Sequence, residues 1–217
     1  MRFHELALLW AFGAGTAVAQ GLPPPPQCAT CHGERGASVA PDVPHLDGQV
    51  AAYLAESIEL LRDRQRKSLV ADHIPSEWSS ERIREVAQYY GAANEARTPD
   101  ATDPAKVSVG TELFHDRCEI CHDDDGRDTD PRGAGSPKLA GQRLAYLLAQ
   151  IRSYVRGERP YLVDVKKRSF LGAPLAVRGV SVGSSGAKIT EEDADAIAHF
   201  LAAAPRTVKP TRTTRLR

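Results

Sequence analysis

All four cysteines of the chain belong to one short motif that occurs twice. The motif Cys-x-x-Cys-His occupies residues 28–32 and again residues 118–122. Two residues between the thiols let both sulfurs reach one edge of a porphyrin and form thioether bonds, and the adjoining histidine can then bind the iron. The motifs therefore predict two covalently bound c-type haems. The expected attachment residues are Cys28, Cys31, Cys118 and Cys121.

Other uses of paired cysteines remain open at this point. A disulfide, a thioredoxin-like motif, or a zinc site assembled from two Cys-x-x-Cys halves would each use the same spacing. None of these requires a histidine directly after both pairs, so haem attachment is the favoured interpretation.

Composition limits the classes of function. The 217 residues are 41% hydrophobic, which suffices for two small domains, and two haems would add apolar surface to their cores. The formal net charge is zero, so the chain as a whole gives no indication of nucleic-acid binding. No Ser-His-Asp set, phosphate-binding loop or paired carboxylates point to an independent hydrolase or transferase.

The N-terminus has the features of a secretory signal. Arg2 precedes an apolar run from residue 6 to residue 18, and Ala17-Val18-Ala19 offers a cleavage site. We expect a signal peptide at 1–19 and a periplasmic protein; an uncleaved membrane anchor is the alternative.

A second signature, Pro-x-Leu-x-Gly-Gln, also occurs twice, at residues 44–49 and 137–142. Each copy precedes a run of apolar residues with helical spacing, and each half ends in another such run. The four runs are Val50, Leu54, Ile58 and Leu61; Ile83, Val86, Ala87 and Tyr90; Leu144, Leu148, Ile151 and Val155; and Ala194, Ile197, Ala198 and Leu201. A capping box at 190–193 and Ser79 or Ser80 with Glu81 predict where the closing helices begin.

The two halves differ before their cysteine motifs. Prolines at 23–26 argue against a helix in front of the first motif, whereas a helix from Ser108 should lead into the second. Residues 92–106 lack apolar periodicity and are predicted to be a linker. The expected organisation is a first domain at 20–91, a second at 107–204, and a basic tail at 205–217.

The sequence resembles the two-domain, dihaem class I cytochromes c, typified by the cytochrome c-four group and the dihaem subunit of flavocytochrome c sulfide dehydrogenase. The resemblance is carried by the paired motifs and signatures, by Gly110-x-x-Leu113-Phe114, and by closing helices with Tyr89 and Phe200. It implies an all-α fold of two tandem class I cytochrome c domains, each around one haem. It also implies that His32 and His122 are proximal iron ligands, hydrogen-bonded to the carbonyls of Pro44 and Pro137.

The distal side departs from the family, which commonly uses methionine there. Met1 is the only methionine, so the cleaved chain has none to bind iron. His73 falls near the family's methionine position and is the candidate sixth ligand of the first haem, with His45 as a competitor. Two histidine ligands would make that haem low-spin and more reducing than a His/Met haem.

The second half offers no equivalent histidine. His115 and His199 are interpreted as surface or packing residues, and Lys166 and Lys167 are weaker candidate ligands in a basic loop. The segment from signature to closing helix is eighteen residues longer than in the first half, with the extra residues within 169–188. We expect a rebuilt distal wall and an iron that is five-coordinate or unusually ligated.

Two charged segments complete the sequence. The acidic run at 123–130 lacks calcium-loop spacing and is interpreted as a solvated loop. The basic tail is interpreted as disordered, with docking to an acidic partner or an anionic membrane as the alternative.

The predicted function is electron transfer between redox partner proteins, such as a dehydrogenase, a terminal oxidase or a flavoprotein subunit. The alternative is a haem enzyme, or the haem subunit of one, that acts on peroxide or a reduced sulfur compound at an open second iron.

Overall fold

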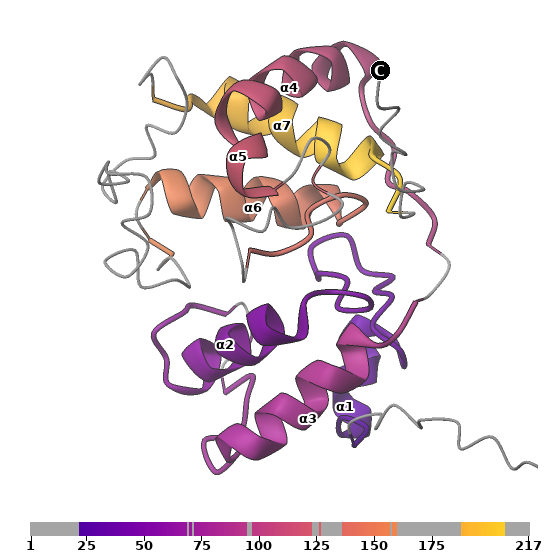
Figure 1. Ribbon diagram of the computed structural model, residues 1–217, viewed down its shortest axis with the longest axis vertical. Helices are drawn as coiled ribbons and strands as arrows, with labels where there is room; N and C mark the ends of the chain where they lie inside the picture. Colours follow the sequence, from indigo (N-terminus) through magenta and orange to yellow (C-terminus); the bar gives the residue numbers. More distant parts are fainter. Residues whose placement is uncertain are drawn as a thin grey trace, which may run out of the picture.

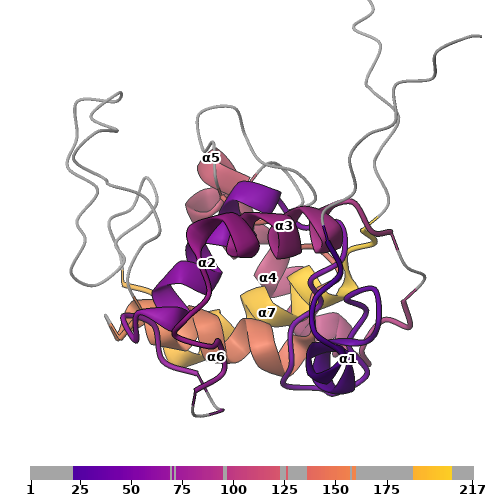
Figure 2. The ribbon, with the colours of Figure 1, turned by 90° about the horizontal axis from the view of Figure 1, so that it is seen from below.

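The computed structural model describes residues 22–68, 70, 72–94, 97–122, 126, 136–156, 158–159 and 188–206. Within these ranges the chain forms helices and no strands, which confirms the predicted all-α class. Two groups of helices lie one above the other, α1 to α3 in one half and α4 to α7 in the other (Figure 1). Seen along the long axis, the first half lies in front of the second (Figure 2).

The first half contains α1 (Pro26–His32), α2 (Ala51–Arg62) and α3 (Ser80–Gly91). Helix α2 packs on α3 through the apolar faces predicted from the sequence. Ser79 caps α3 by accepting a hydrogen bond from the Arg82 backbone. The buried core of this half consists of Tyr53, Leu54, Val86, Ala87 and Tyr90.

The second half contains α4 (Pro104–Arg117), the short α5 (Glu119–His122), α6 (Leu144–Val155) and α7 (Glu191–Ala203). Helix α7 packs against both α4 and α6, and the predicted capping box at 190–193 starts it. The buried core of this half consists of Phe114, Leu147, Ile197, Ala198, Leu201 and Ala202.

Gly110 allows the close approach of α4 to α7. A Cβ atom at this position would overlap the carbonyl oxygen of Ala196 and lie 2.9 Å from the Cβ of Phe200. The glycine therefore belongs to the packing of these two helices, and the first half has no equivalent crossing in its described residues.

Helix α4 begins earlier than the sequence analysis predicted. Its first residue is Pro104 rather than Ser108, so its first turn falls inside the segment predicted to be linker. Asp103 accepts a hydrogen bond from the Ala105 backbone, and a proline at the first helical position costs no hydrogen bond. Because proline is tolerated at the first position of a helix, α1 can begin at Pro26, and the first motif lies within this helix.

The linker also fixes the start of α6. The Asp100 carboxylate accepts a hydrogen bond from the Leu144 backbone at 2.6 Å and pairs with Arg143 at 2.9 Å. No helix among the described residues is long and apolar enough to cross a membrane.

Candidate haem-binding sites

Helix α1 positions the first cysteine motif. His32 is 7% exposed, and its Nδ1 donates a hydrogen bond to the carbonyl of Pro44 at 3.0 Å. This bond fixes the ring and leaves Nε2 available for a metal. Burial is the main cause that lowers the pKa of His32, which favours the neutral form that binds iron. Cys28 and Cys31 lie on the same helix, half-buried and exposed respectively.

The second motif repeats this arrangement on α5. His122 donates a hydrogen bond from Nδ1 to the carbonyl of Pro137 at 3.1 Å, and burial lowers its pKa to about 4. Cys118, which precedes α5, is half-buried, and the side chain of Cys121 lies outside the described part of the structure. The proline carbonyls thus stand where the resemblance implied.

His73 faces His32. The centroids of the two rings are 5.9 Å apart and their planes differ by 6°. Ser68 is hydrogen-bonded to Nδ1 of His73 at 2.9 Å, so Nε2 remains available on this ring as well. A metal bonded to one nitrogen of each ring, with bonds of about 2 Å, places the centroids roughly 6 Å apart. The distance between the rings is therefore suited to a haem iron that both histidines would hold.

Two described residues between α2 and His73 have an uncommon backbone conformation. Arg64 and Asp72 have φ angles of +57° and +49°, and their side chains form an ion pair at 2.7 Å. Non-glycine residues in this left-handed region carry a small energetic cost that the surrounding structure must offset. The ion pair links the end of α2 to the residue that precedes His73.

The remaining described histidines have other surroundings, and the ring Nδ1 of His45 is buried without a hydrogen-bond partner among the described residues. His45 is buried next to Pro44 at the boundary between the halves, where its backbone N–H donates to Gln142. His115 contacts Glu119 at 2.7 Å, and Nδ1 of His199 accepts a hydrogen bond from the Asp103 backbone at 3.0 Å. In the described part of the chain, no histidine ring lies against His122 as His73 lies against His32.

Several predicted features lie outside the described residues. These are the signal peptide at 1–19, the acidic residues 123–125, 128 and 130, the candidate ligands Lys166 and Lys167, residues 169–187 of the extra segment, and residues 207–217 of the tail.

Two glutamines join the halves, and the sequence analysis did not assign them a role. Gln142 bonds both main-chain groups of His45, accepting from its N–H at 2.7 Å and donating to its carbonyl at 2.9 Å. Gln49 does the same to Lys138, at 2.8 Å for each bond. The signal that could have found them is the presence of glutamine at the end of both Pro-x-Leu-x-Gly-Gln signatures.

Arginine–tyrosine pairs cross the same boundary in both directions. Arg66 of the first half donates to Tyr146 at 2.9 Å, and Arg159 of the second half donates to Tyr53 at 2.7 Å. Arg159 is only 5% exposed and forms no ion pair with a carboxylate among the described residues. A buried guanidinium beside a phenol is a donor set that suits a carboxylate, such as the propionate of a haem.

A buried ion pair lies beside the first signature. The guanidinium of Arg97 contacts the Asp47 carboxylate and also donates to the carbonyl of Gly141 at 3.3 Å. Asp47 is 2% exposed, and the equivalent residue of the second signature, Ala140, is fully buried. Arg97 therefore connects a first-half acid to a second-half backbone, and only the first signature carries a charge at this position.

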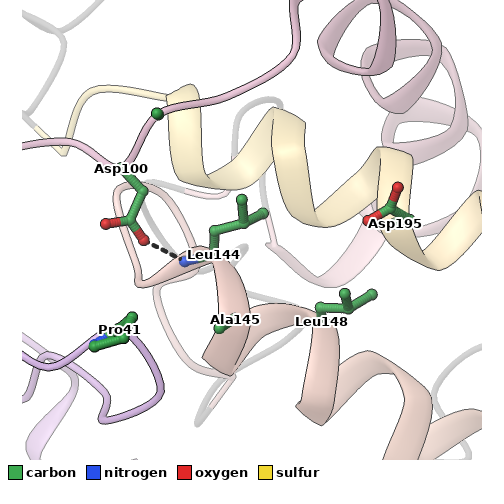
Figure 3. A pocket seen from close by; sticks show the side chains of 7 residues that line it. Pro41, Asp100, Leu144, Ala145, Leu148 and Asp195 are labelled. Atoms are coloured by element: carbon green, nitrogen blue, oxygen red, sulfur yellow. Dashed lines mark hydrogen bonds between the residues drawn. The ribbon is translucent and has the colours of Figure 1, made fainter.

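A cavity of about 370 Å³ lies between the linker and the faces of α6 and α7 (Figure 3). Figure 3 shows Leu144 and Leu148 of α6 below Asp195 of α7, with Asp100 bonded to the backbone of Leu144. No residue of either cysteine motif lines this cavity. It is therefore separate from the histidine pair of the first half.

Residues 15–95 and 107–205 each match the model of the Cytochrome c family. The chain belongs to this family.

Among curated proteins, the chain is 29% identical over 183 residues to cytochrome c4 of Pseudomonas aeruginosa, covering 81% of this chain and 89% of the relative. It is 27% identical over 216 residues to the thiosulfate dehydrogenase electron acceptor of Thiomonas intermedia, covering 95% and 89%. Among solved structures, reduced cytochrome c4 from Pseudomonas stutzeri superposes with a TM-score of 0.66 at 26% identity, covering 82% of this chain and 94% of that one. The protein is thus a cytochrome c4-like dihaem cytochrome, with two c-type haems and a role in electron transfer.

Proposed function

We propose that the chain is a periplasmic electron carrier, exported by cleavage after residue 19, whose two haems differ in axial ligation. His32 and His73 bind the first iron. His122 binds the second, whose sixth position holds no methionine. The facing rings of His32 and His73, with Nε2 available on each, carry this proposal.

Each haem supplies a reversible one-electron couple when bound. The Pro44 and Pro137 carbonyls hold the proximal rings in one orientation and tautomer. Arg159 and Tyr53 would offer charge-assisted hydrogen bonds to a haem propionate. The two proposed domains are residues 20–91 and 107–204, and α4 extends the second back to Pro104. Two imidazole ligands favour a lower potential on the first iron than a thioether would.

A second candidate function uses the second iron as a binding site for a small molecule. Two observations favour it: the cleaved chain contains no methionine, and no described histidine ring opposes His122. Lys166 or Lys167 would close the site if either bound the iron. A peroxide or a reduced sulfur compound would be the class of ligand, and the chain would then act as a haem enzyme or as a subunit of one.

The partners in either case are redox proteins. One relative is named a thiosulfate dehydrogenase electron acceptor, so a dehydrogenase that oxidises a sulfur compound is the proposed electron donor. A terminal oxidase or a flavoprotein subunit would complete the transfer, and nucleic acid has no part in it. The basic residues of the tail are proposed to contribute only weakly, through an acidic partner or an anionic membrane.

Electron paramagnetic resonance and optical spectra of the oxidised and reduced holoprotein test these proposals. We expect two haems per chain, one with low-spin bis-histidine signals and one with different signals. Carbon monoxide should leave the first reduced haem unchanged. Carbon monoxide binding at the second haem supports the small-molecule function, and failure to bind at either haem supports a pure carrier. A high-spin first haem, or two haems with identical bis-histidine signals, would contradict the proposed difference in ligation.

A further inference from the structure

The hydrogen bond of each proximal histidine ends on a peptide group that the other half also binds. In the peptide between Pro44 and His45, the carbonyl accepts from His32 Nδ1 at 3.0 Å and the N–H donates to Gln142 Oε1 at 2.7 Å. Both bonds are therefore made by opposite ends of one planar amide.

The second half repeats this arrangement with the roles of the halves exchanged. In the peptide between Pro137 and Lys138, the carbonyl accepts from His122 Nδ1 at 3.1 Å and the N–H donates to Gln49 Oε1 at 2.8 Å. Each glutamine is thus two hydrogen bonds away from the proximal histidine of the half to which it does not belong.

The two glutamine side chains are well fixed. Gln49 is 5% exposed and Gln142 is 6% exposed. Each Oε1 also accepts from the next backbone N–H of its own chain segment, Val50 at 2.9 Å and Arg143 at 3.0 Å. Because Oε1 receives two N–H groups and Nε2 points to a carbonyl, the orientation of each amide is determined by its partners.

The physical effect follows from polarisation along the hydrogen-bonded chain. An acceptor at the N–H of a peptide increases the negative charge on its carbonyl oxygen, and this strengthens the bond from Nδ1–H. A stronger bond at Nδ1 makes the imidazole a better electron donor through Nε2, which stabilises oxidised iron. By this effect, the glutamine of one half would lower the reduction potential of a haem bound in the other half.

We infer that Gln142 and Gln49 are positioning residues that tune the two haems crosswise. Gln142 sets the potential of the haem attached at Cys28 and Cys31, and Gln49 sets that of the haem attached at Cys118 and Cys121. This inference rests on the proposed ligation by His32 and His122. If the two halves separated, the reduction potentials of both haems would therefore change.

The test uses the holoprotein and its Gln142→Leu and Gln49→Leu variants, with Gln88→Leu, an exposed residue of α3, as the matched control. Redox titration monitored by nuclear magnetic resonance gives the potential of each haem. Contacts from each haem to the cysteines of its own motif assign the signals. The Nδ1 proton of each proximal histidine reports the hydrogen bond itself.

Gln142→Leu should raise the reduction potential of the first haem. The equilibrium constant for electron transfer from the second haem to the first should then rise roughly two- to threefold. The Nδ1 proton signal of His32 should also move. Gln49→Leu should do the same to the second haem and to His122. Gln88→Leu should change neither.

Equal shifts at both haems, a shift confined to the haem of the substituted half, or no shift would overturn the inference. Paramagnetic resonance spectra of the same samples report axial ligation separately. Spectra that exclude histidine on the proximal side would refute the proposed ligation. Histidine-type spectra without the crossed shifts would refute the crosswise tuning alone.

Discussion

On the side of the cysteine motifs, the first and second haem sites repeat each other bond for bond: a histidine after the cysteines, a proline carbonyl, and a glutamine from the opposite half. On the other side they diverge. His73 faces His32 from the segment that carries the exposed Arg64–Asp72 ion pair, whereas no described histidine ring opposes His122. The shared side would hold both haems and their proximal histidines in the same way, whereas the divergent side would let the two irons differ in their sixth ligand. A repeated motif is therefore a guide to how a cofactor is held rather than to what it does.

The largest effect is expected from the removal of His73, the ring that distinguishes the first haem site from the second. In His73→Ala we expect the first haem to lose its sixth ligand and to bind cyanide or carbon monoxide that the parent haem excludes. Optical titration of the holoprotein measures the change. His115→Ala is the matched control, because His115 contacts Glu119 and not His32. An unchanged low-spin first haem in His73→Ala would show that another residue binds that iron.

The buried charge at residue 47, where the second signature has the uncharged Ala140, provides the next test. Arg97→Met removes the buried guanidinium that is bonded to the Asp47 carboxylate, and Arg206, whose charge also acts on Asp47, makes no such bond, so we expect a loss of about 3 kcal/mol in the free energy of unfolding. Denaturant titration measures it. Adding Asp47→Ala, which copies Ala140 of the second signature, should recover most of the loss. Arg152→Met, which removes an exposed ion pair with Glu191, should change little. A similar loss in Arg152→Met would mean that burial is not the cause.

The crossing of α4 and α7 distinguishes the second half from the first. Gly110→Ala places a methyl group against the Ala196 carbonyl, and we expect a cost of about 1–3 kcal/mol. The spectrum of the second haem should change at lower denaturant concentration than that of the first. Val109→Ala, an exposed neighbour on the same helix, is the control. Simultaneous loss of both haem spectra would show that the halves unfold as one unit.

A further effect depends on pH and on one histidine of the first half, whose equivalent in the second half is Lys138. Burial, followed by the charges of Arg97, Arg143 and Arg206, lowers the pKa of His45 to about 3 from a usual value of 6.5. Between these values the unfolded chain binds a proton that the folded protein does not. Stability should therefore fall as the pH decreases from about 6.5 to 3, by up to about 1.4 kcal/mol per pH unit.

Denaturation of His45→Gln across this range should show a shallower dependence on pH. Lys138→Gln, the equivalent change in the second half, should leave the slope unaltered. If both variants keep the slope of the parent, His45 is not the group responsible.

The sequence predicted the all-α fold class and the two c-type haems correctly. The apolar spacing indicated α2, α3, α6 and α7, and the repeated motifs indicated two c-type haems, because both signals are local. The start of α4 was missed because the analysis followed apolar periodicity, while the Asp103-Pro104 cap and first residue carried the signal.

Contacts between the halves could not be predicted in the same way. Gln142 and His45 are 97 residues apart, and Arg97 lies in a segment whose composition indicated only a linker. Their partners depend on how the two halves pack, and no spacing within either half encodes this. The repetition of glutamine in the two signatures was the one available hint.

The exchange of glutamine bonds has the pattern of a two-fold symmetric interface, in which position i of one unit contacts position j of the other and j contacts i. Two separate copies of one such domain could pair through the same bonds as a homodimer. Covalent linkage makes that pairing intramolecular, so it no longer depends on protein concentration. It also frees the two copies from having identical sequences. An acid can then stand at residue 47 and an alanine at residue 140, which no homodimer of a single sequence could achieve.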